Sequence, residues 1–279
     1  MNRPARRAIP GPHLRRGEAW GVGLRRVTLE CLADAGAVMA APGIAEAERV
    51  HQVRVVLKRA RAVLRLFEAG GCRWARTNRL RLSRLARELS RLRDTAVLSD
   101  LRQRLRLGAG RIRTRSRGIA AVWFAALAAE QASLAARRWP EFTPAQRRRV
   151  LAAMARELGR REAAARARPK ARRVHAWRKR VIVLREQLRV LWLQLPARQR
   201  RLVARLQAVA RKLGGAQDLS LLLATEKAIG TGAAHAARLA SLKARRRRKV
   251  KAARHLAAGL TAELAATFAP PPRQALVSA

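Results

Sequence analysis

The sequence predicts an all-α protein made of two helical bundles, each with about five helices. Tyrosine is absent, aromatic residues make up 4% of the chain, and the high content of Ala, Leu, Arg and Glu favours helix over strand. Apolar and polar residues show no convincing alternation with a period of two, which is the pattern of strands. A set of basic residues also recurs at a constant offset, and this recurrence indicates two related halves.

The recurring residues form two basic stripes, each on one predicted helix. The first stripe consists of His51, Arg54, Lys58, Arg61 and Arg65. The second stripe consists of His175, Arg178, Ile182, Arg185 and Arg189. Positions 51 and 175 differ by 124, and the positions of Asp94 and Asp218 differ by the same number. An offset kept over so many residues predicts an internal duplication into paired subdomains.

Turn-forming residues divide the first half into helices. The helix over 18–40 ends before Pro42-Gly43, and the helix over 44–67 ends before Gly70-Gly71. A helix over 73–92 is followed by one over 95–107, which ends at the glycines of 108–110. The last helix of this half covers 115–138 and ends before Trp139-Pro140.

The second half divides in the same way. Helices over 144–166, 171–195 and 197–213 end before Pro169, Pro196 and Gly214-Gly215 respectively. A helix over 219–229 ends at the turn of 230–232, and a long helix covers 233–267. Shifting the first set of helices by 124 brings it onto the second, within the few residues to which such boundaries are known.

Length and repeat together predict one domain over 18–268. Repeat 1 covers about 18–139 and repeat 2 about 141–267. We expect the segment 1–17, which is rich in Arg, Pro and Gly, and the tail 269–279 to be disordered.

The charge of the chain indicates a polyanionic partner. Its 63 Lys and Arg residues face 17 Asp and Glu residues, which gives a formal net charge of +46. Such an excess repels itself in a compact state and attracts anions to any groove that concentrates it. A codon bias toward Arg is the alternative explanation for the surface arginines, and we interpret the run of 245–249 as a solvated helix face. Hydrophobic residues make up 49%, enough for a large core.

Several classes of protein fit the sequence poorly. The N-terminal segment has no apolar run typical of a signal peptide, and no stretch reaches the roughly 18 apolar residues of a membrane-spanning helix, so we expect a cytoplasmic protein. Cys31 and Cys72 lack the spacing of a metal site, and we expect both to be reduced, small apolar residues. We predict neither a metal nor a cofactor.

Helical geometry places each basic stripe beside the core. The five positions of the first stripe span an arc of about 80° and a length of about 21 Å. The centre of the apolar arc lies only about 110° from the stripe. That arc consists of Val53, Leu57, Ala60, Leu64 and Phe67 in the first helix. In the second helix it consists of Trp177, Val181, Leu184, Leu188 and Leu191. Packing both helices inward about a pseudo-twofold axis therefore predicts one basic groove with a stripe on each wall.

Acidic residues are almost absent beside the stripes. A solvated helix face normally carries acids that pair with the basic residues at i to i+4 spacing. Between His51 and Phe67 there is no Asp or Glu, and between His175 and Trp192 there is only Glu186. A row of like charges destabilises a helix unless an anion neutralises it, which favours anion binding over a solvated face. The second stripe is the weaker one, because Ile182 stands where the first has Lys58.

These residues resemble the CHAD family, the conserved histidine α-helical domain, over roughly 18–265. The resemblance is carried by Val50-His51-Gln52-Val53-Arg54, Lys58, Arg61, Arg93-Asp94, Val174-His175-Ala176-Trp177-Arg178, Arg185 and Leu213-Gly214 followed by Asp218. It implies two helical bundles related by pseudo-twofold symmetry, with a basic central cavity that binds inorganic polyphosphate. It also implies phosphate contacts by His51, Arg54, Lys58, Arg61, His175, Arg178 and Arg185.

The chemistry of the stripes fits the same ligand. Arg forms bidentate hydrogen bonds with phosphate and Lys supplies a point charge, so we include Arg65 and Arg189 among the contacts. The histidines would be protonated beside phosphates, although a hydrogen-bonded core histidine is the alternative. Weaker phosphate candidates are Lys179, Arg81, Arg87, Arg205 and Arg211. Asp94 and Asp218 either cap helices or hold the rotamers of neighbouring Arg and His side chains.

The sequence favours a binding protein over an enzyme. We find no Gly-rich phosphate loop, HExxH motif or serine elbow. Glu46 and Glu48 superficially resemble the acidic pair of triphosphate-tunnel enzymes, but acids at a helix N-terminus explain them. We therefore predict a polyphosphate-binding protein that is targeted to, or scaffolds, polyphosphate granules. A nucleic-acid binder is the main alternative, and a polyphosphate-processing enzyme is a weaker one.

Overall fold

The computed structural model describes residues 11–89, 119–228 and 232–269. Every regular element in these ranges is helical, which confirms the predicted all-α class. The first half contains α1 (Trp20–Ala40), α2 (Glu46–Ala69), α3 (Arg73–Glu88) and α5 (Ile119–Ala135). The second half contains α6 (Pro144–Ala167), α7 (Ala171–Val190), the 3-10 helix η1 (Trp192–Gln194), α8 (Ala197–Lys227), α9 (Ala233–Leu256) and α10 (Leu260–Phe268). The helix predicted over 95–107 lies outside the described residues.

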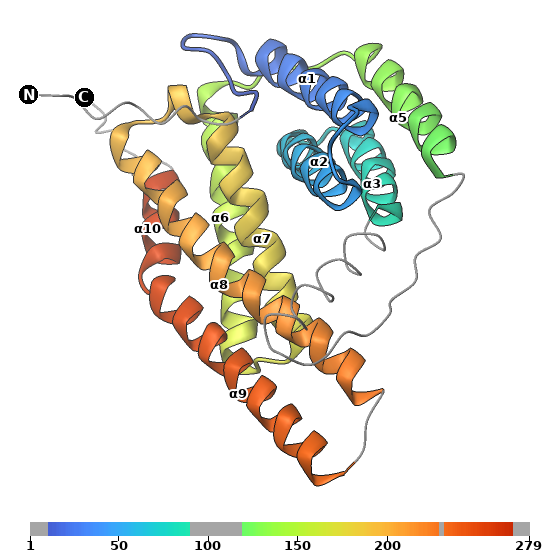
Figure 1. Cartoon of the computed structure of the whole chain (residues 1–279). Coiled ribbons are helices and arrows are strands. Elements are labelled where there is room, and N and C mark those ends of the chain that lie inside the picture. The colour runs from blue at the N-terminus through green and yellow to red at the C-terminus, as the bar shows by residue number, and fades with distance from the viewer. Residues whose placement is uncertain (1–10, 90–118, 229–231, 270–279) are drawn as a thin grey trace, which may run out of the picture.

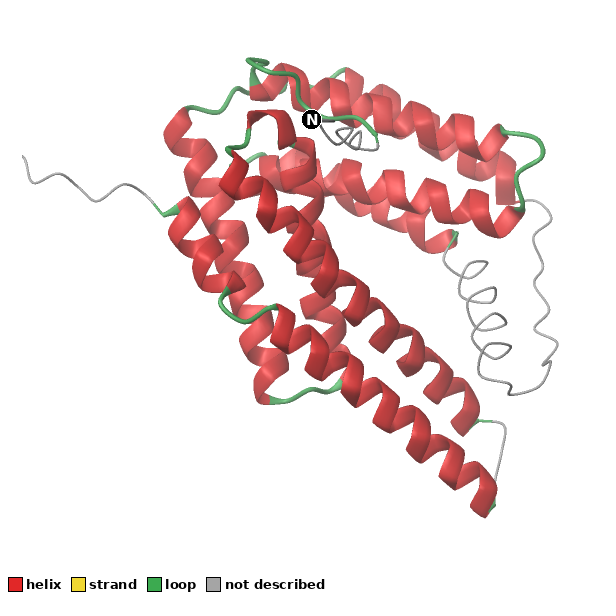
Figure 2. Cartoon of the chain, turned by 60° about the vertical axis from the view of Figure 1, so that its left-hand side comes forward, coloured by secondary structure: helices red, strands yellow, loops and turns green. Residues whose placement is uncertain are grey.

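The helices form two groups that meet at α2 and α7 (Figure 1). In the first group α2 packs against α1 and α3, while α5 packs against α1 and α3. In the second group α7 lies between α6 and α8, α9 runs along α8, and α10 packs against α6. Figure 2 shows that the two groups lie at an angle to each other. The pair of helices that carries the predicted stripes therefore also joins the two halves.

The apolar arcs predicted for α2 and α7 are buried. Val53, Leu57, Ala60, Leu64 and Phe67 are fully buried in α2. On the other side of the junction, Trp177, Val181, Leu184, Leu188 and Leu191 are at most 1% exposed. Both sets belong to one continuous hydrophobic core that extends through the two groups of helices. Burying each large side chain contributes roughly 1.5–3 kcal/mol, so this core is the main source of stability.

Two predicted helix boundaries are wrong, and tertiary packing explains both. The break predicted at Gly214-Gly215 is absent, because α8 runs through both glycines. The helical cost of about 1 kcal/mol per glycine is offset by burial of Leu213, Ala216 and Leu219 on the same helix. Asp218 therefore lies inside α8 and does not cap a separate helix.

The long helix predicted over 233–267 is divided in two. Gly259 adopts a left-handed conformation with φ of 71°, which side chains with a Cβ atom disfavour. The chain turns there and α10 packs back against α6, burying Leu260, Leu264 and Phe268. The gain in buried apolar surface explains why the helix ends although its sequence could continue it.

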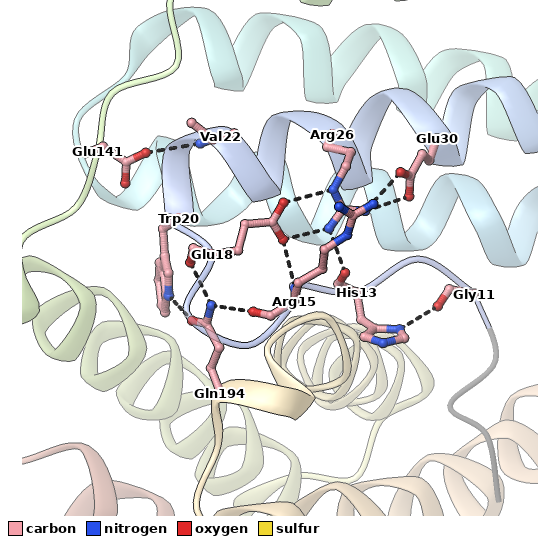
Figure 3. A network of polar contacts seen from close by, with 10 residues as sticks. All are labelled: Gly11, His13, Arg15, Glu18, Trp20, Val22, Arg26, Glu30, Glu141 and Gln194. Carbon is pink, nitrogen blue, oxygen red and sulfur yellow. Dashed lines mark hydrogen bonds and ion pairs between the residues drawn. The ribbon is translucent and has the colours of Figure 1, made fainter.

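The segment before α1 is anchored to the fold, although disorder was predicted through Gly17. Leu14 is fully buried, and its backbone N–H donates to the carbonyl oxygen of Val190 over 2.8 Å. Figure 3 shows Gln194 binding the same segment: its Nε2 donates to the carbonyl oxygens of Arg15 at 3.0 Å and Glu18 at 2.7 Å. Residues 11–17 thus connect α1 to the end of α7, and residues 1–10 lie outside the described range.

Cys31 and Cys72 are free, and burial raises the pKa of the Cys31 thiol to about 12. Across the described ranges, no helix is both long and apolar enough to cross a membrane.

Replacing Leu14 with alanine tests whether residues 11–17 belong to the fold. We expect the L14A variant to lose about 2–5 kcal/mol of unfolding free energy, because the cavity lies in the continuous core. Urea denaturation measures this loss, with Val22→Ala as the control because Val22 is 65% exposed. Equal stability of the two variants would contradict the packing of residues 11–17 onto the fold.

Candidate anion-binding surface

A buried ion pair links the two stripe-bearing helices. Nε of Arg59 in α2 donates to Oε2 of Glu186 in α7 over 3.4 Å, and both side chains are at most 7% exposed. Beside this pair, Nε2 of Gln187 donates to the carbonyl oxygen of Ala62 over 3.0 Å. These two contacts cross from one half of the chain to the other, so they fix how α2 lies on α7.

Glu186 also holds two arginines of the second stripe. Nε and Nη2 of Arg185 donate to Oε1 of Glu186 at 2.9 Å and 2.5 Å, and Nη1 of Arg189 lies 3.7 Å from the same oxygen. The carboxylate of Glu186 therefore interacts with three guanidinium groups, those of Arg59, Arg185 and Arg189. Part of the positive charge predicted for phosphate contact is neutralised inside the protein, while the cluster keeps a net positive charge.

Arginines of each stripe form hydrogen bonds with the third helix of their own half, which is α3 in the first half and α8 in the second. From α2, Nη1 of Arg54 donates to the carbonyl oxygen of Ala86 over 2.7 Å, and Nη1 of Arg61 donates to Oγ of Ser83 over 3.3 Å. From α7, Nη1 of Arg185 donates to Oε1 of Gln207 over 2.6 Å. The stripes therefore follow the α2–α3 and α7–α8 contacts, and the single groove with two walls stays a prediction.

One of these contacts occurs in both halves at the same offset. Arg61 and Arg185 differ by 124 positions, and their partners Ser83 and Gln207 differ by 124 as well. The first residues of α1 and α6 also differ by 124, as do those of α3 and α8. Corresponding helices thus make corresponding contacts.

Two cations of the first stripe, Arg61 and Arg65, are partly shielded from water. Burial, together with the charges of Arg54 and Arg79, lowers the pKa of Arg61 to about 10. Burial and the positive charges of Arg180 and Arg79 also lower the pKa of Arg65 to about 10, although the carboxylates of Glu68 and Glu157 oppose this shift. Within the described ranges neither arginine forms an ion pair. A bound anion would offset the cost of holding these charges away from water.

His175 is in a similar environment on the second stripe. Burial lowers the pKa of its imidazole below the usual 6.5, and the nearby cations Lys179 and Arg178 lower it further, while a hydrogen bond with Gln217 opposes them. The ring is therefore neutral at pH 7, and an anion beside it would favour protonation. His51, its counterpart on α2, is exposed.

The remaining candidates are dispersed. Arg81 pairs with Glu130 of α5 at 3.4 Å, and Arg205 pairs with Glu263 of α10, so both join helices within a half. The side chains of Arg87, Lys179 and Arg211 are exposed, and those of Lys58 and Asp218 are partly buried. Asp94 lies outside the described residues.

Sequence reasoning missed the buried contacts between the halves. Arg59 lies in the first stripe-bearing helix but outside its basic arc, and Gln187 is an ordinary polar residue in the sequence. The available signal was Glu186, the lone acid in a basic helix, which indicates a specific internal partner. Among the described residues, no group of three or more His, Cys, Asp or Glu side chains is placed to hold a metal ion.

Comparison with known proteins identifies one family. Residues 31–227 match the family described as the CHAD domain. No curated protein and no solved structure shows a significant match to the chain.

Replacing Glu186 with glutamine tests the junction between the halves. We expect the E186Q variant to lose about 3–5 kcal/mol of unfolding free energy, because Arg59 stays buried without its carboxylate. Chemical denaturation measures the loss, and Glu46→Gln at the exposed start of α2 is the control. A loss no larger than that of the control would show that the buried pair does not hold the halves together.

The lowered pKa of His175 predicts a pH dependence of stability. The unfolded chain binds the proton more readily than the folded one, so the unfolding free energy falls as pH drops through 6.5. His175→Asn removes this titration, and we expect the variant to lose less stability between about pH 7.5 and about pH 5.5. Denaturation curves at the two pH values give the comparison. The same pH dependence of stability in the variant and the parent would show that His175 is not its source.

Proposed function

The chain belongs to the CHAD-domain family, and on that premise we propose that it binds inorganic polyphosphate through the basic surface of α2 and α7. Polyphosphate binding is the general property known for this domain. The observation in this chain that carries the proposal is Arg61, which is shielded from water, lies among the cations Arg54 and Arg79, and forms no ion pair among the described residues. Partly buried, unneutralised guanidinium groups are well suited to phosphate, since they lose little further hydration on binding.

Polyphosphate explains the surface better than nucleic acid does. Recognition of single-stranded nucleic acid uses exposed aromatic rings on which bases stack. Trp20, Trp123 and Trp177 are at most 4% exposed and belong to the core. Trp74 packs against Phe67, with ring centroids 5.8 Å apart. A chain of linked phosphates has no bases and needs only cations, which this surface supplies.

We infer that the two halves arose by duplication and contribute unequally to binding. The recurrent contact of Arg61 with Ser83 and of Arg185 with Gln207 supports the duplication. The second stripe has Ile182 in place of a cation, and its Arg185 is held by Glu186. The first stripe therefore contributes most of the phosphate contacts in this proposal.

The proposed role is binding without turnover, in a cytoplasmic protein that is targeted to, or scaffolds, polyphosphate granules. The described residues include no set of carboxylates placed to hold the metal ions that phosphoryl transfer uses. Incubation with polyphosphate and Mg²⁺ checks this point, and release of orthophosphate would contradict it.

Competition binding at fixed salt tests the ligand. Labelled polyphosphate bound to the full chain is challenged with duplex DNA of equal phosphate content. We expect DNA to displace the label only at a large excess of phosphate. Displacement at equal phosphate concentration would show that the surface attracts any polyanion and would overturn the proposal.

Variants of the first stripe provide the corresponding mutational prediction. We expect K58A/R61A to bind polyphosphate at least tenfold more weakly, because each charge-assisted hydrogen bond contributes about 1.5–3 kcal/mol. The matched control is R148A/R149A, which removes two exposed charges from α6 and should bind as the parent does apart from a small nonspecific loss. Ile182→Lys should strengthen binding by restoring the missing cation. Calorimetric titration measures all three, and equal losses in the two double variants would contradict a specific stripe.

A further inference from the structure

A second basic site lies where α9 passes the turn between α6 and α7. A surface pocket of about 560 Å³ opens there. Its lining consists of Pro169, Arg246, Arg247, Arg248, Val250, Lys251 and Arg254. Five of these seven residues are Arg or Lys, and none is acidic. The helix that supplies them follows residue 227, where the match to the CHAD domain ends.

Two of the arginines are fixed by neutral acceptors. Nε of Arg246 donates to Oγ of Ser220 at 2.8 Å, and its Nη2 donates to the carbonyl oxygen of Pro169 at 3.2 Å. Nη2 of Arg254 donates to the carbonyl oxygens of Ala165 and Arg166, both at 3.0 Å. These contacts hold the side chains in place and leave their charges unneutralised. Nε of Arg254 is also buried without a hydrogen-bond partner among the described residues.

The other cations of the pocket are available to a ligand. Arg247, Arg248 and Lys251 are exposed. Arg247, Lys251 and Arg254 are spaced by four and three residues, so they form a row on one face of α9, with steps of about 6 Å and about 4.5 Å along the helix axis. The sequence alone favoured a solvated face for the run 245–249. However, α9 contains no Asp or Glu, so that face lacks the i to i+4 partners that normally stabilise it.

We propose that this pocket is a second anion-binding site, and that it takes a short linear oligophosphate. A row of cations suits several linked phosphates better than a single one. No aromatic side chain lines the pocket, which disfavours a nucleotide base. In this arrangement Arg247, Arg248 and Lys251 contact the phosphates, while Arg246 and Arg254 shape the wall. The site is independent of the stripes, since its residues come from α9 and the turn before α7.

Calorimetric titration of the full chain with tripolyphosphate tests the site. We expect two binding events in the parent chain, one at the first stripe and one at this pocket. R247A/K251A should lose one event, or weaken it at least tenfold, because both exposed side chains line the pocket and neither forms a hydrogen bond or ion pair among the described residues. The matched control is K243A/R245A, which removes two exposed charges from the same helix outside the pocket. It should keep both events.

The outcomes separate this site from the proposed function. If K58A/R61A loses one event and R247A/K251A loses the other, both sites are supported. If only K58A/R61A has an effect, the pocket is refuted and the stripe stands. If only R247A/K251A has an effect, the pocket stands and the stripe fails. Equal weakening by R247A/K251A and K243A/R245A would show attraction by net charge alone and would overturn the pocket. R247Q/K251Q, which removes both charges but keeps polar side chains at these positions, should lose the same binding event as R247A/K251A if the charges are responsible.

Discussion

The junction between α2 and α7 is the constraint on which the rest of the structure depends. At this junction the buried carboxylate of Glu186, in the second half, forms an ion pair with Arg59 of the first half. Charges removed from water are costly unless they are well paired, so this contact tolerates little displacement of one helix against the other. Because both basic stripes lie on these two helices, the same contact decides how far apart the basic side chains of the two stripes are held.

The two halves carry different residues at this junction. At the offset of 124, Arg59 corresponds to Val183 and Ala62 corresponds to Glu186. Two identical helices with an arginine at the same place would repel each other on contact, whereas a cation on one and an acid on the other attract. The difference at these positions gives the halves complementary surfaces, and Glu186 also neutralises part of the charge of Arg185 and Arg189.

The excess of positive charge is therefore distributed over distinct roles. Some arginines, such as Arg79 with Glu68 and Arg26 with Glu18, are neutralised by acids within the fold. Others, such as Arg246 and Arg254, donate to neutral oxygens and have no acidic partner among the described residues, so their charge remains on the surface of α9. Arg61 is the clearest case in α2, since it is shielded from water among other cations. Charges of the last two kinds are the ones that an external polyanion can stabilise.

Local chemistry in the sequence determined the helices, their apolar faces and the alignment of His51 through Arg65 along one side of α2, because helical periodicity depends only on neighbouring residues. The family resemblance was likewise readable from the sequence and is confirmed. Tertiary structure decided the features that depend on residues far apart in the chain. These are the pairing of Arg59 with Glu186, the docking of Leu14 beside Val190, the continuation of α8 through Gly214 and the turn at Gly259. At Gly214, burial of the neighbouring apolar residues outweighs the helical cost of about 1 kcal/mol for glycine. In all four cases no local pattern in the sequence records which distant segment will be the partner.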